Sequence, residues 1–337
     1  MPAKAGIQRW LWTPAFAGVT KREICAMTST SSQSQKIAVI GAGLMGHGIA
    51  QIFAASGHSV ALHDPDAKIL ASAPERVAAI FDLLAQDNAG LKNLRYEADF
   101  AKAVADVDFV FEAGPEKLEI KRAIFKNLGQ QTKPGAILCT NTSAIPIAQV
   151  GQDVADKSRV VGTHYWNPPH LVPLVEVVQA EATSLATVEK TIALLKAVGK
   201  APVHVRRDIP GFIGNRLQHA LKREAIALVA AGVCDAETLD TVVKEGFGAR
   251  MAVCGPLEQS DLVGLNLTLD IHKTLIADLD RTPGPHPYLV EKVAKGELGM
   301  KTGRGFRDWT PEQAATLRKR LSDFLADSAK AIAAKKR

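Results

Sequence analysis

The chain has 337 residues and a mass of 36.0 kDa, more than one core of about 150 residues usually carries, so two domains are expected. A hydrophobic content of 47%, a charged content of 23% and a mean hydropathy of +0.02 are typical of a globular chain and exclude a disordered one. No apolar run reaches the ~18 residues that a membrane-spanning helix needs, so we expect no membrane partner.

The net charge of +6 is concentrated at the two ends of the sequence. Residues 1–35 carry +3 and residues 318–337 carry +5, which leaves −2 for the residues between them. That middle part has no basic stripe interleaved with aromatic residues, the pattern typical of nucleic-acid binding. The sequence therefore predicts no nucleic-acid partner.

Residues 1–35 are expected to form a disordered extension. Their apolar stretch at 10–19 is interrupted by Pro14 and makes a poor signal-peptide core, and Met27 is a natural start. The cysteines are widely spaced, without the CxxC pairs or clustered His/Cys spacing of a zinc site. They are Cys25, Cys139, Cys234 and Cys254. These observations favour a reducing, cytoplasmic setting and predict no metal site.

From Lys36 onward, short apolar runs alternate with amphipathic stretches. The apolar runs predict strands at 36–40, 58–63, 107–112 and 136–140. The stretches between them predict helices at 44–56, 67–86 and 117–131, the second of which can break at Pro74. Strands that alternate with helices build βαβ units, so we expect a parallel sheet with helices on both faces.

After residue 159 the rhythm changes, because a proline-rich reversal separates two apolar runs. The elements expected here are strands at 160–165, 174–178 and 202–206 and a helix at 185–198. Pro210-Gly211 then predicts the start of a long helix at 212–231, and only helices are expected from there to residue 309. The fold class is thus α/β, a doubly wound, mainly parallel sheet at 36–208 followed by an all-helical domain at 209–310. A C-terminal helix and basic tail are expected at 311–337.

A glycine pattern follows the first predicted strand and opens the first helix. Gly41-Ala-Gly-Leu-Met-Gly46 fits G-x-G-x-x-G, in which the first glycine makes a tight turn, the second lets a pyrophosphate approach the helix N-terminus, and the third permits close helix–strand packing. The residues expected at a dinucleotide are Gly41, Gly43, Leu44, Met45 and Gly46. The competing interpretation is a purely structural turn.

An acidic residue completes this pattern. Asp64 ends the next predicted strand, 23 residues after Gly41, where a carboxylate accepts hydrogen bonds from the adenosine ribose hydroxyls. A 2′-phosphate would meet this carboxylate, and the following Pro65 offers no compensating cation. NAD is therefore favoured over NADP as the cofactor.

A histidine and a carboxylate are predicted to face each other across the proline-rich reversal. If the chain reverses at His170, His164 on the first strand falls opposite Glu176 on the second. A carboxylate on one imidazole nitrogen fixes the tautomer and leaves the other nitrogen able to take a proton, as the oxidation of an alcohol requires. The alternative is a hydrogen-bonded core histidine, and we interpret His170 and His204 as structural.

Several separated motifs along residues 36–309 resemble the L-3-hydroxyacyl-CoA dehydrogenase family. They are the glycine turn running into Gly48-Ile-Ala-Gln51, Asn141-Thr-Ser143, the segment from His164 to Glu176, Pro210-Gly-Phe-Ile-Gly-Asn-Arg216 and Leu298-Gly-Met-Lys-Thr-Gly-Arg-Gly-Phe306. The resemblance implies a Rossmann-type domain that binds NAD and a helical dimerisation domain. Apolar helical stretches such as 225–230 also favour a homodimer.

The resemblance also implies roles for individual residues. His164 matches the family's catalytic base and Glu176 its partner, while Ser143 and Asn215 match hydrogen-bonding partners of the substrate. Positions near the cofactor are matched by Glu116, Lys121 and Asn141, the first two toward the nicotinamide end. The implied reaction is NAD-dependent oxidation of a secondary 3-hydroxyl, foremost of (S)-3-hydroxyacyl-CoA to 3-oxoacyl-CoA.

One departure keeps a second substrate class open. Family members that act on CoA thioesters usually carry a lysine-rich stretch after the second strand, whereas residues 65–90 here offer only Lys68 and Arg76. The segment from Asn167 to Glu176 also resembles the branch of lambda-crystallin (L-gulonate 3-dehydrogenase), carnitine dehydrogenase and pyridine-carboxylate alcohol dehydrogenases, which oxidise small free acids. A protein that binds NAD without turnover is the remote alternative.

Overall fold

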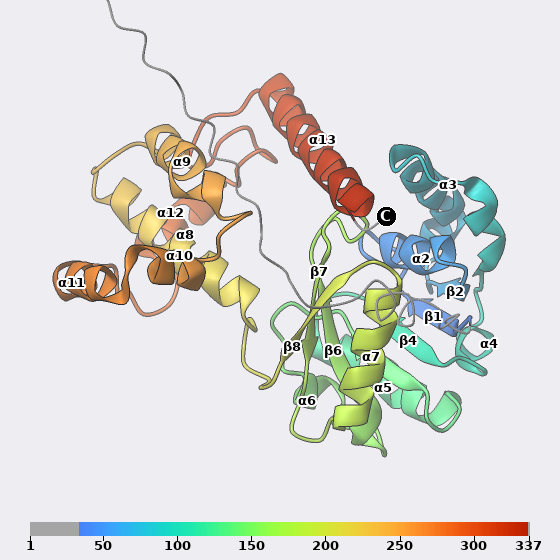
Figure 1. Cartoon of the computed structure of the whole chain (residues 1–337). Helices are drawn as coiled ribbons and strands as arrows, with labels where there is room; N and C mark the ends of the chain where they lie inside the picture. The colour runs from blue at the N-terminus through green and yellow to red at the C-terminus, as the bar shows by residue number, and fades with distance from the viewer. Residues whose placement is uncertain (1–33, 336–337) are drawn as a thin grey trace, which may run out of the picture. The chain divides into compact units, whose positions relative to one another are not determined.

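The computed structural model describes residues 34–335 (Figure 1). The extension expected at 1–35, with Met27 and Cys25, lies almost wholly outside the described residues. In the described part, no helix is both long enough and apolar enough to cross a membrane.

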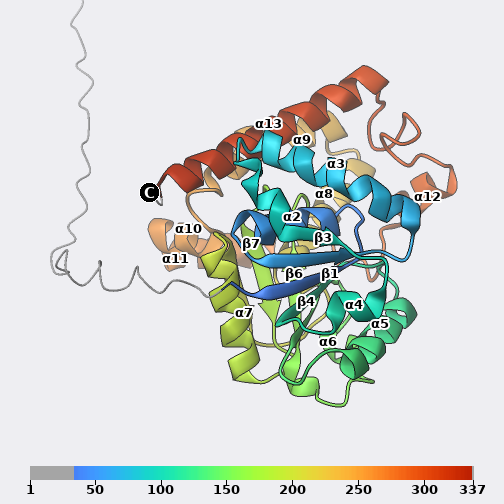
Figure 2. The same ribbon diagram turned by 90° about the vertical axis from the view of Figure 1, so that its right-hand side faces the viewer.

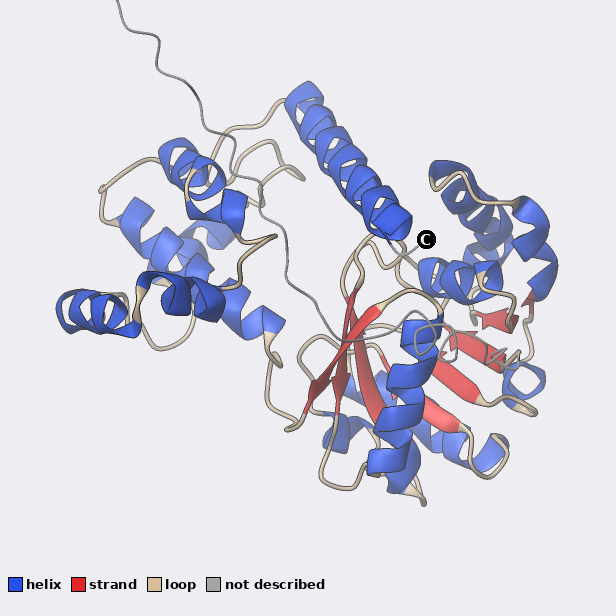
Figure 3. Cartoon of the chain, viewed as in Figure 1, coloured by secondary structure: helices blue, strands red, loops and turns tan. Residues whose placement is uncertain are grey.

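Eight strands form one sheet in the order β3-β2-β1-β4-β5-β6-β7-β8 (Figure 3). All neighbouring strands are parallel except β6 and β7, which run antiparallel. The strands are β1 (Lys36–Ile40), β2 (Ser59–His63), β3 (Leu94–Tyr96), β4 (Phe109–Glu112), β5 (Ile137–Thr140), β6 (Val160–Tyr165), β7 (Leu174–Val178) and β8 (Ala201–Val205). The expected Rossmann-type, mainly parallel sheet is confirmed, and β3 is an edge strand that the sequence analysis missed.

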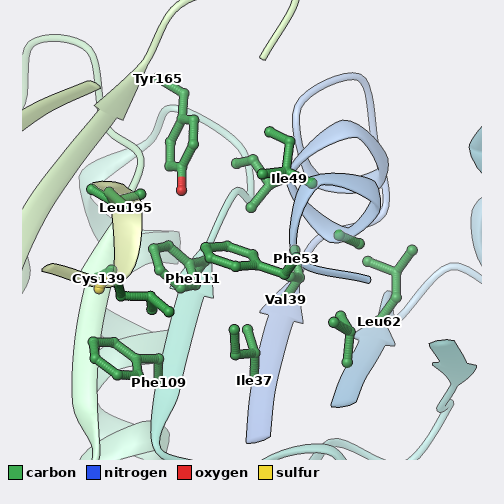
Figure 4. Packing of buried hydrophobic residues seen from close by; sticks show 14 of the residues in the cluster. Ile37, Val39, Ile49, Phe53, Leu62, Phe109, Phe111, Cys139, Tyr165 and Leu195 are labelled. Atoms are coloured by element: carbon green, nitrogen blue, oxygen red, sulfur yellow. The ribbon is translucent and has the colours of Figure 1, made fainter. Parts of the chain in front are cut away.

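Helices cover both faces of the sheet, because successive residues of a buried strand point to opposite sides. In β1, Ile37 and Val39 pack under α2 (Gly46–Ala55), α3 (Ala67–Leu83) and α7 (Leu185–Ala197), as Figures 2 and 4 show. Ala38 and Ile40 pack on the other side, under α4 (Phe100–Val104), α5 (Leu118–Gln131) and α6 (Ile147–Val150). Short 3-10 turns at Asn88–Asn93, Lys157–Arg159 and Phe247–Arg250 complete the connections.

The helix α3 runs through Pro74 without a break, in contrast to the break allowed by the sequence. Proline removes one backbone hydrogen bond from a helix interior. The apolar face of α3, including the buried Leu70, Ala73 and Val77, packs on its neighbours, and Pro74 itself is exposed. Packing of an amphipathic face supplies most of a helix's stability in a folded protein, so one lost hydrogen bond is tolerated.

The C-terminal part is helical, with two differences from expectation. Its helices are α8 (Gly214–Ala230), α9 (Ala236–Glu245), α10 (Pro256–Val263), α11 (Leu265–Leu275), α12 (Pro287–Ala294) and α13 (Pro311–Lys335). The first begins after Ile213 because Gly211 and Phe212 have φ values of 75° and 50°, outside the helical region. The segment 298–306 is not helical: Arg304 forms bridges with Gly299 and Asp308 around a glycine-rich turn.

The glycine turn between β1 and α2 has little room for side chains at two of its positions. Gly41 has φ 100°, and a Cβ there would lie 2.7 Å from the carbonyl oxygen of Ala113. A Cβ on Gly46 would lie 1.6 Å from the carbonyl oxygen of Gly41, so no side chain fits. A Cβ on Gly43 would meet nothing within 4 Å, so this backbone faces open space. Only Gly41 and Gly46 are therefore required by the packing of the chain itself.

This contrast predicts that two alanine substitutions differ in their effect on stability. Gly43→Ala should leave the thermal unfolding midpoint of the cofactor-free protein unchanged but weaken NAD⁺ binding by about tenfold or more, because its methyl group enters the space through which a pyrophosphate approaches. Gly46→Ala should lower both the midpoint and the affinity. Scanning fluorimetry and NADH fluorescence titration measure the two quantities. Unchanged affinity in Gly43→Ala would contradict a dinucleotide site at this turn.

Candidate functional site

The predicted histidine–carboxylate pair is present at the end of the sheet. His164 on β6 is directly opposite Glu176 on β7 in the antiparallel register. The imidazole Nδ1 lies 2.7 Å from Glu176 Oε2, and the two residues are only 5% and 1% exposed. The reversal between the strands thus has the length that the sequence analysis inferred.

The second oxygen of this carboxylate binds the start of the helical region. Glu176 Oε1 accepts hydrogen bonds from the backbone amides of Ile213, at 2.9 Å, and Gly214, at 3.0 Å. Burial raises the pKa of Glu176, but the hydrogen bonds from His164 and the two amides outweigh burial and hold the pKa below its usual value. The carboxylate is therefore ionised at neutral pH and acts only as an acceptor.

Two aromatic rings pack beside the histidine. The rings of Trp166 and Phe212 each have a centroid 5.6 Å from that of His164. Trp166 also lies close against the first turn of α8, since a Cβ on Gly214 would be 2.4 Å from its Cζ2. Because Glu176 of β7, Trp166 of the loop after β6 and Phe212 at the start of the helical region all contact the imidazole, the orientation of the ring is fixed from three sides.

Ser143 and Asn215, the two residues matched to substrate binding, are brought together. Asn215 Nδ2 donates a hydrogen bond to the carbonyl oxygen of Ser143 at 3.0 Å. Asn215 also directly follows Gly214, whose amide binds Glu176. The four residues matched to the reaction are thus connected through the first turn of α8.

Glu116 supports the backbone around Ser143. Its Oε1 accepts hydrogen bonds from Thr142 Oγ1 at 2.6 Å and from the amides of Ser143 and Ala144 at 2.7 and 3.3 Å. Burial raises the pKa of this carboxyl, but these donors and the charge of Lys121 lower it to below its usual value overall. Glu116, expected near the cofactor, therefore also connects the loop after β4 to the loop after β5.

A buried ion pair beneath Glu116 was not anticipated from the sequence. Lys121 Nζ lies 2.9 and 3.0 Å from the two oxygens of Glu112, and both side chains are almost completely buried. Glu112 also accepts hydrogen bonds from Thr140 Oγ1 and the amide of Gly114, both at 2.7 Å. The only signal in the sequence was a glutamate ending an apolar strand, with a lysine nine residues later. The pair fixes the loop after β4 at the carboxyl edge of the sheet.

The residues expected at a dinucleotide lie around the glycine turn and at the ends of the neighbouring strands. Asp64 accepts hydrogen bonds from the amides of Ala42 and Asp66, at 2.8 and 2.9 Å, which places its carboxylate beside the glycine turn. Helix α2 begins there without a side-chain cap, so its first amides point toward the turn. Leu44 is exposed at this rim and Met45 is half-buried. Asn141 Oδ1 accepts from the amide of Tyr165 at 2.9 Å and so joins the ends of β5 and β6.

The two histidines interpreted as structural lie apart from the pair. His204 Nε2 is 2.9 Å from Gln179 Oε1, and His170 packs near Gly48 of α2. Residues 34–335 contain no cluster of three His, Cys, Asp or Glu side chains that could hold a metal ion.

Comparisons with known proteins agree with this geometry. The family model for the NAD-binding domain of 3-hydroxyacyl-CoA dehydrogenase matches residues 36–209, and the model for its C-terminal domain matches residues 211–309. A relative from Mesorhizobium japonicum, 5-formyl-3-hydroxy-2-methylpyridine 4-carboxylate 5-dehydrogenase, is 35% identical over 292 residues, 84% of this chain and 93% of the relative.

Two solved structures show the same fold. The crystal structure of a 5-formyl-3-hydroxy-2-methylpyridine 4-carboxylic acid 5-dehydrogenase, described as an NAD⁺-dependent dismutase, has a TM-score of 0.83 at 33% identity and covers 89% of this chain and 99% of its own. That of (S)-3-hydroxybutyryl-CoA dehydrogenase from Ralstonia eutropha has a TM-score of 0.69 at 30% identity, covering 82% and 100%. The chain therefore belongs to the 3-hydroxyacyl-CoA dehydrogenase family and is an NAD-dependent oxidoreductase of that type.

Proposed function

We propose that the chain oxidises a substrate hydroxyl to a carbonyl with His164 as the general base. NAD⁺, when bound, supplies the hydride acceptor, and a base must take the hydroxyl proton. The ionised Glu176 can only accept a hydrogen bond, so His164 Nδ1 carries the hydrogen between them and Nε2 offers the lone pair. The same carboxylate stabilises the imidazolium once the proton has moved.

Ser143 and Asn215 orient the substrate oxygen in this proposal. Asn215 donates a hydrogen bond to the backbone carbonyl of Ser143, and the Ser143 amide donates one to Glu116. These bonds hold both residues in place. A substrate hydroxyl held between them and the imidazole would need little reorganisation, which is how positioned groups lower a barrier. The observation that carries the proposal is the buried His164–Glu176 pair joined to these residues through α8.

We further propose that the substrate is a small free hydroxy acid rather than a CoA thioester. CoA phosphates are usually bound by Lys or Arg. Of the two cations on α3, Arg76 already donates hydrogen bonds to the carbonyl oxygens of Ile69 and Ser72, at 2.9 and 3.3 Å, within its own helix. The fold likeness to the pyridine-carboxylate enzyme supports the same choice. A thioester substrate remains the second candidate, favoured by the likeness to (S)-3-hydroxybutyryl-CoA dehydrogenase.

The two substrate classes predict different assays. With NADH formation as the readout, a panel of L-carnitine, L-gulonate and 3-hydroxybutyrate should contain a substrate whose kcat/KM exceeds that of (S)-3-hydroxybutyryl-CoA. Because only a carboxylate needs binding, adding CoA to such a substrate should bring no gain. Turnover of the thioester with a KM that rises with salt would favour the second candidate. Salt weakens contacts between CoA phosphates and protein cations, because the Debye length is only ~10 Å in 0.1 M salt.

Substitution of the pair tests the assigned base. His164→Gln should lower kcat by roughly 10²- to 10⁴-fold, the usual contribution of a positioned general base. Glu176→Gln should also slow turnover, because the charge that stabilises the imidazolium is lost, while NADH binding persists because the glycine turn is untouched. Steady-state kinetics and NADH titration measure both effects. Turnover near that of the wild type in either variant would remove the pair from the mechanism.

We also propose that the chain forms a homodimer through its helical region. The helices α8 to α12 contain no fully buried residue. Large apolar side chains are exposed there, among them Val253 at 89% and Leu257 and Leu262 at 79% each. Apolar exposure on this scale is typical of a surface that is covered by a partner, and a second copy is the occupant that the family resemblance implies.

Aspartates on this surface should separate the copies. Light scattering at micromolar concentration should report a dimer for the wild type and a monomer for the double variant Leu257→Asp, Leu262→Asp, because charges are costly in an apolar interface. Leu185→Asp is the matched control, since Leu185 is an exposed leucine on α7. A monomeric wild type, or a dimer lost equally in the control, would contradict the assignment.

A further inference from the structure

Lys200 is a buried cation that the mechanism above does not use. It directly precedes β8 and is only 8% exposed. Its ammonium donates hydrogen bonds to the carbonyl oxygens of Pro169 and, at 3.0 Å, Val172. Both acceptors are backbone carbonyls, whereas lysines this deeply buried are usually paired with a carboxylate. Burial of a lysine without a carboxylate partner is costly, which indicates that its two hydrogen bonds serve to hold these carbonyls in place.

Both carbonyls belong to the loop 166–173 that joins β6 to β7. Trp166 opens this loop and packs against His164. In its middle, Pro169 is in close contact with α2, because a Cβ on Gly48 would lie 2.7 Å from Pro169 Cγ. The loop is therefore held between α2 on one side and Lys200 on the other.

We propose that Lys200 is a positioning residue of the dehydrogenase site, which fixes the loop 166–173 through these two carbonyls and so holds Trp166 against His164. The inference rests on the proposed role of His164 as the base. The ammonium of Lys200 donates its hydrogen bonds to the loop rather than to the imidazole. It therefore acts on the reaction only through the placement of Trp166 and of the strands that carry His164 and Glu176.

The charges around Lys200 are consistent with this role. Burial lowers its pKa to about 8, so the side chain is mainly a cation at neutral pH and its two hydrogen bonds are charge-assisted. Burial, followed by the charges of His47 and Lys200, lowers the pKa of the neighbouring His170 to about 4, so that ring is neutral and does not repel the ammonium. Lys200 and His170 line a cavity of about 290 Å³, and Lys330 of α13 lines it as well.

Fluorine NMR of the full chain labelled with 5-fluorotryptophan tests the loop directly and needs no substrate. The resonance of Trp166 is identified by its loss in Trp166→Phe, and Trp309 serves as an internal reference. In Lys200→Met the Trp166 resonance should shift or broaden while that of Trp309 stays in place. Lys196→Met, which changes an exposed lysine at the end of α7, is the matched control and should leave both resonances unchanged.

Kinetics with the substrate found in the panel then test the effect on the reaction. Lys200→Met should lower kcat by about 10- to 100-fold, the loss expected when reacting groups are displaced by up to about 1 Å. The dissociation constant of NADH should stay within about twofold, because the glycine turn is unaffected. In Lys200→Ala, propylammonium can enter the cavity and should restore part of kcat, whereas tetramethylammonium, which has the charge but no N–H donor, should not.

The outcomes separate this inference from the proposed function. An unchanged Trp166 resonance in Lys200→Met would overturn the inference, as would a loss of kcat that propylammonium and tetramethylammonium restore equally. If Lys200→Met does not fold, Lys200→Gln is read by the same resonance. Its side chain is shorter and uncharged, so it cannot hold both carbonyls as the lysine does, and the Trp166 resonance should again shift or broaden. An unchanged resonance would overturn the inference. Failure of the three free acids and of (S)-3-hydroxybutyryl-CoA alike would count against the proposed reaction but leave the fluorine result interpretable.

Discussion

The site depends on one carboxylate that is bound by two separate parts of the chain. Glu176 accepts hydrogen bonds from the imidazole of His164 and from the amides of Ile213 and Gly214. A buried carboxylate is costly unless its lone pairs accept hydrogen bonds, so these three donors are what allows Glu176 to stay ionised in its buried position. The strand register, the orientation of the histidine and the start of α8 are consequently set together, and none can change without leaving a buried charge unpaired.

The start of α8 shows what this requirement does to the backbone. Gly211 and Phe212 both adopt positive φ, which is unusual for a bulky residue such as phenylalanine. That bend directs the next two amides at Glu176 and places the Phe212 ring beside the imidazole. The strain is thus compensated by the hydrogen bonds and the packing that it makes available, and it lies at the point where the helical region joins the sheet.

The sequence predicted those parts of the fold and the site that depend on local patterns. Apolar runs located every strand of the sheet except the short edge strand β3. The reversal near His170 predicted the pairing of His164 with Glu176, because antiparallel register follows from the length of the connection. The Glu112–Lys121 pair, the contacts of Glu116 and the role of Lys200 depend on which loops meet in space, which no spacing encodes. The possible break at Pro74 does not occur, because the packing of α3 outweighs the local penalty of the proline.

These contacts follow a common arrangement at the carboxyl edge of the sheet. Each loop that reaches the site is held by a charged group: the buried pair of Glu112 and Lys121 after β4, the more exposed Glu116 after β5, and the buried Lys200 after β6. Charged groups make strong hydrogen bonds in a low dielectric, so a few of them can fix loops that lack a core of their own. With the loops fixed in this way, the proposed reacting groups can stay in place whichever substrate binds.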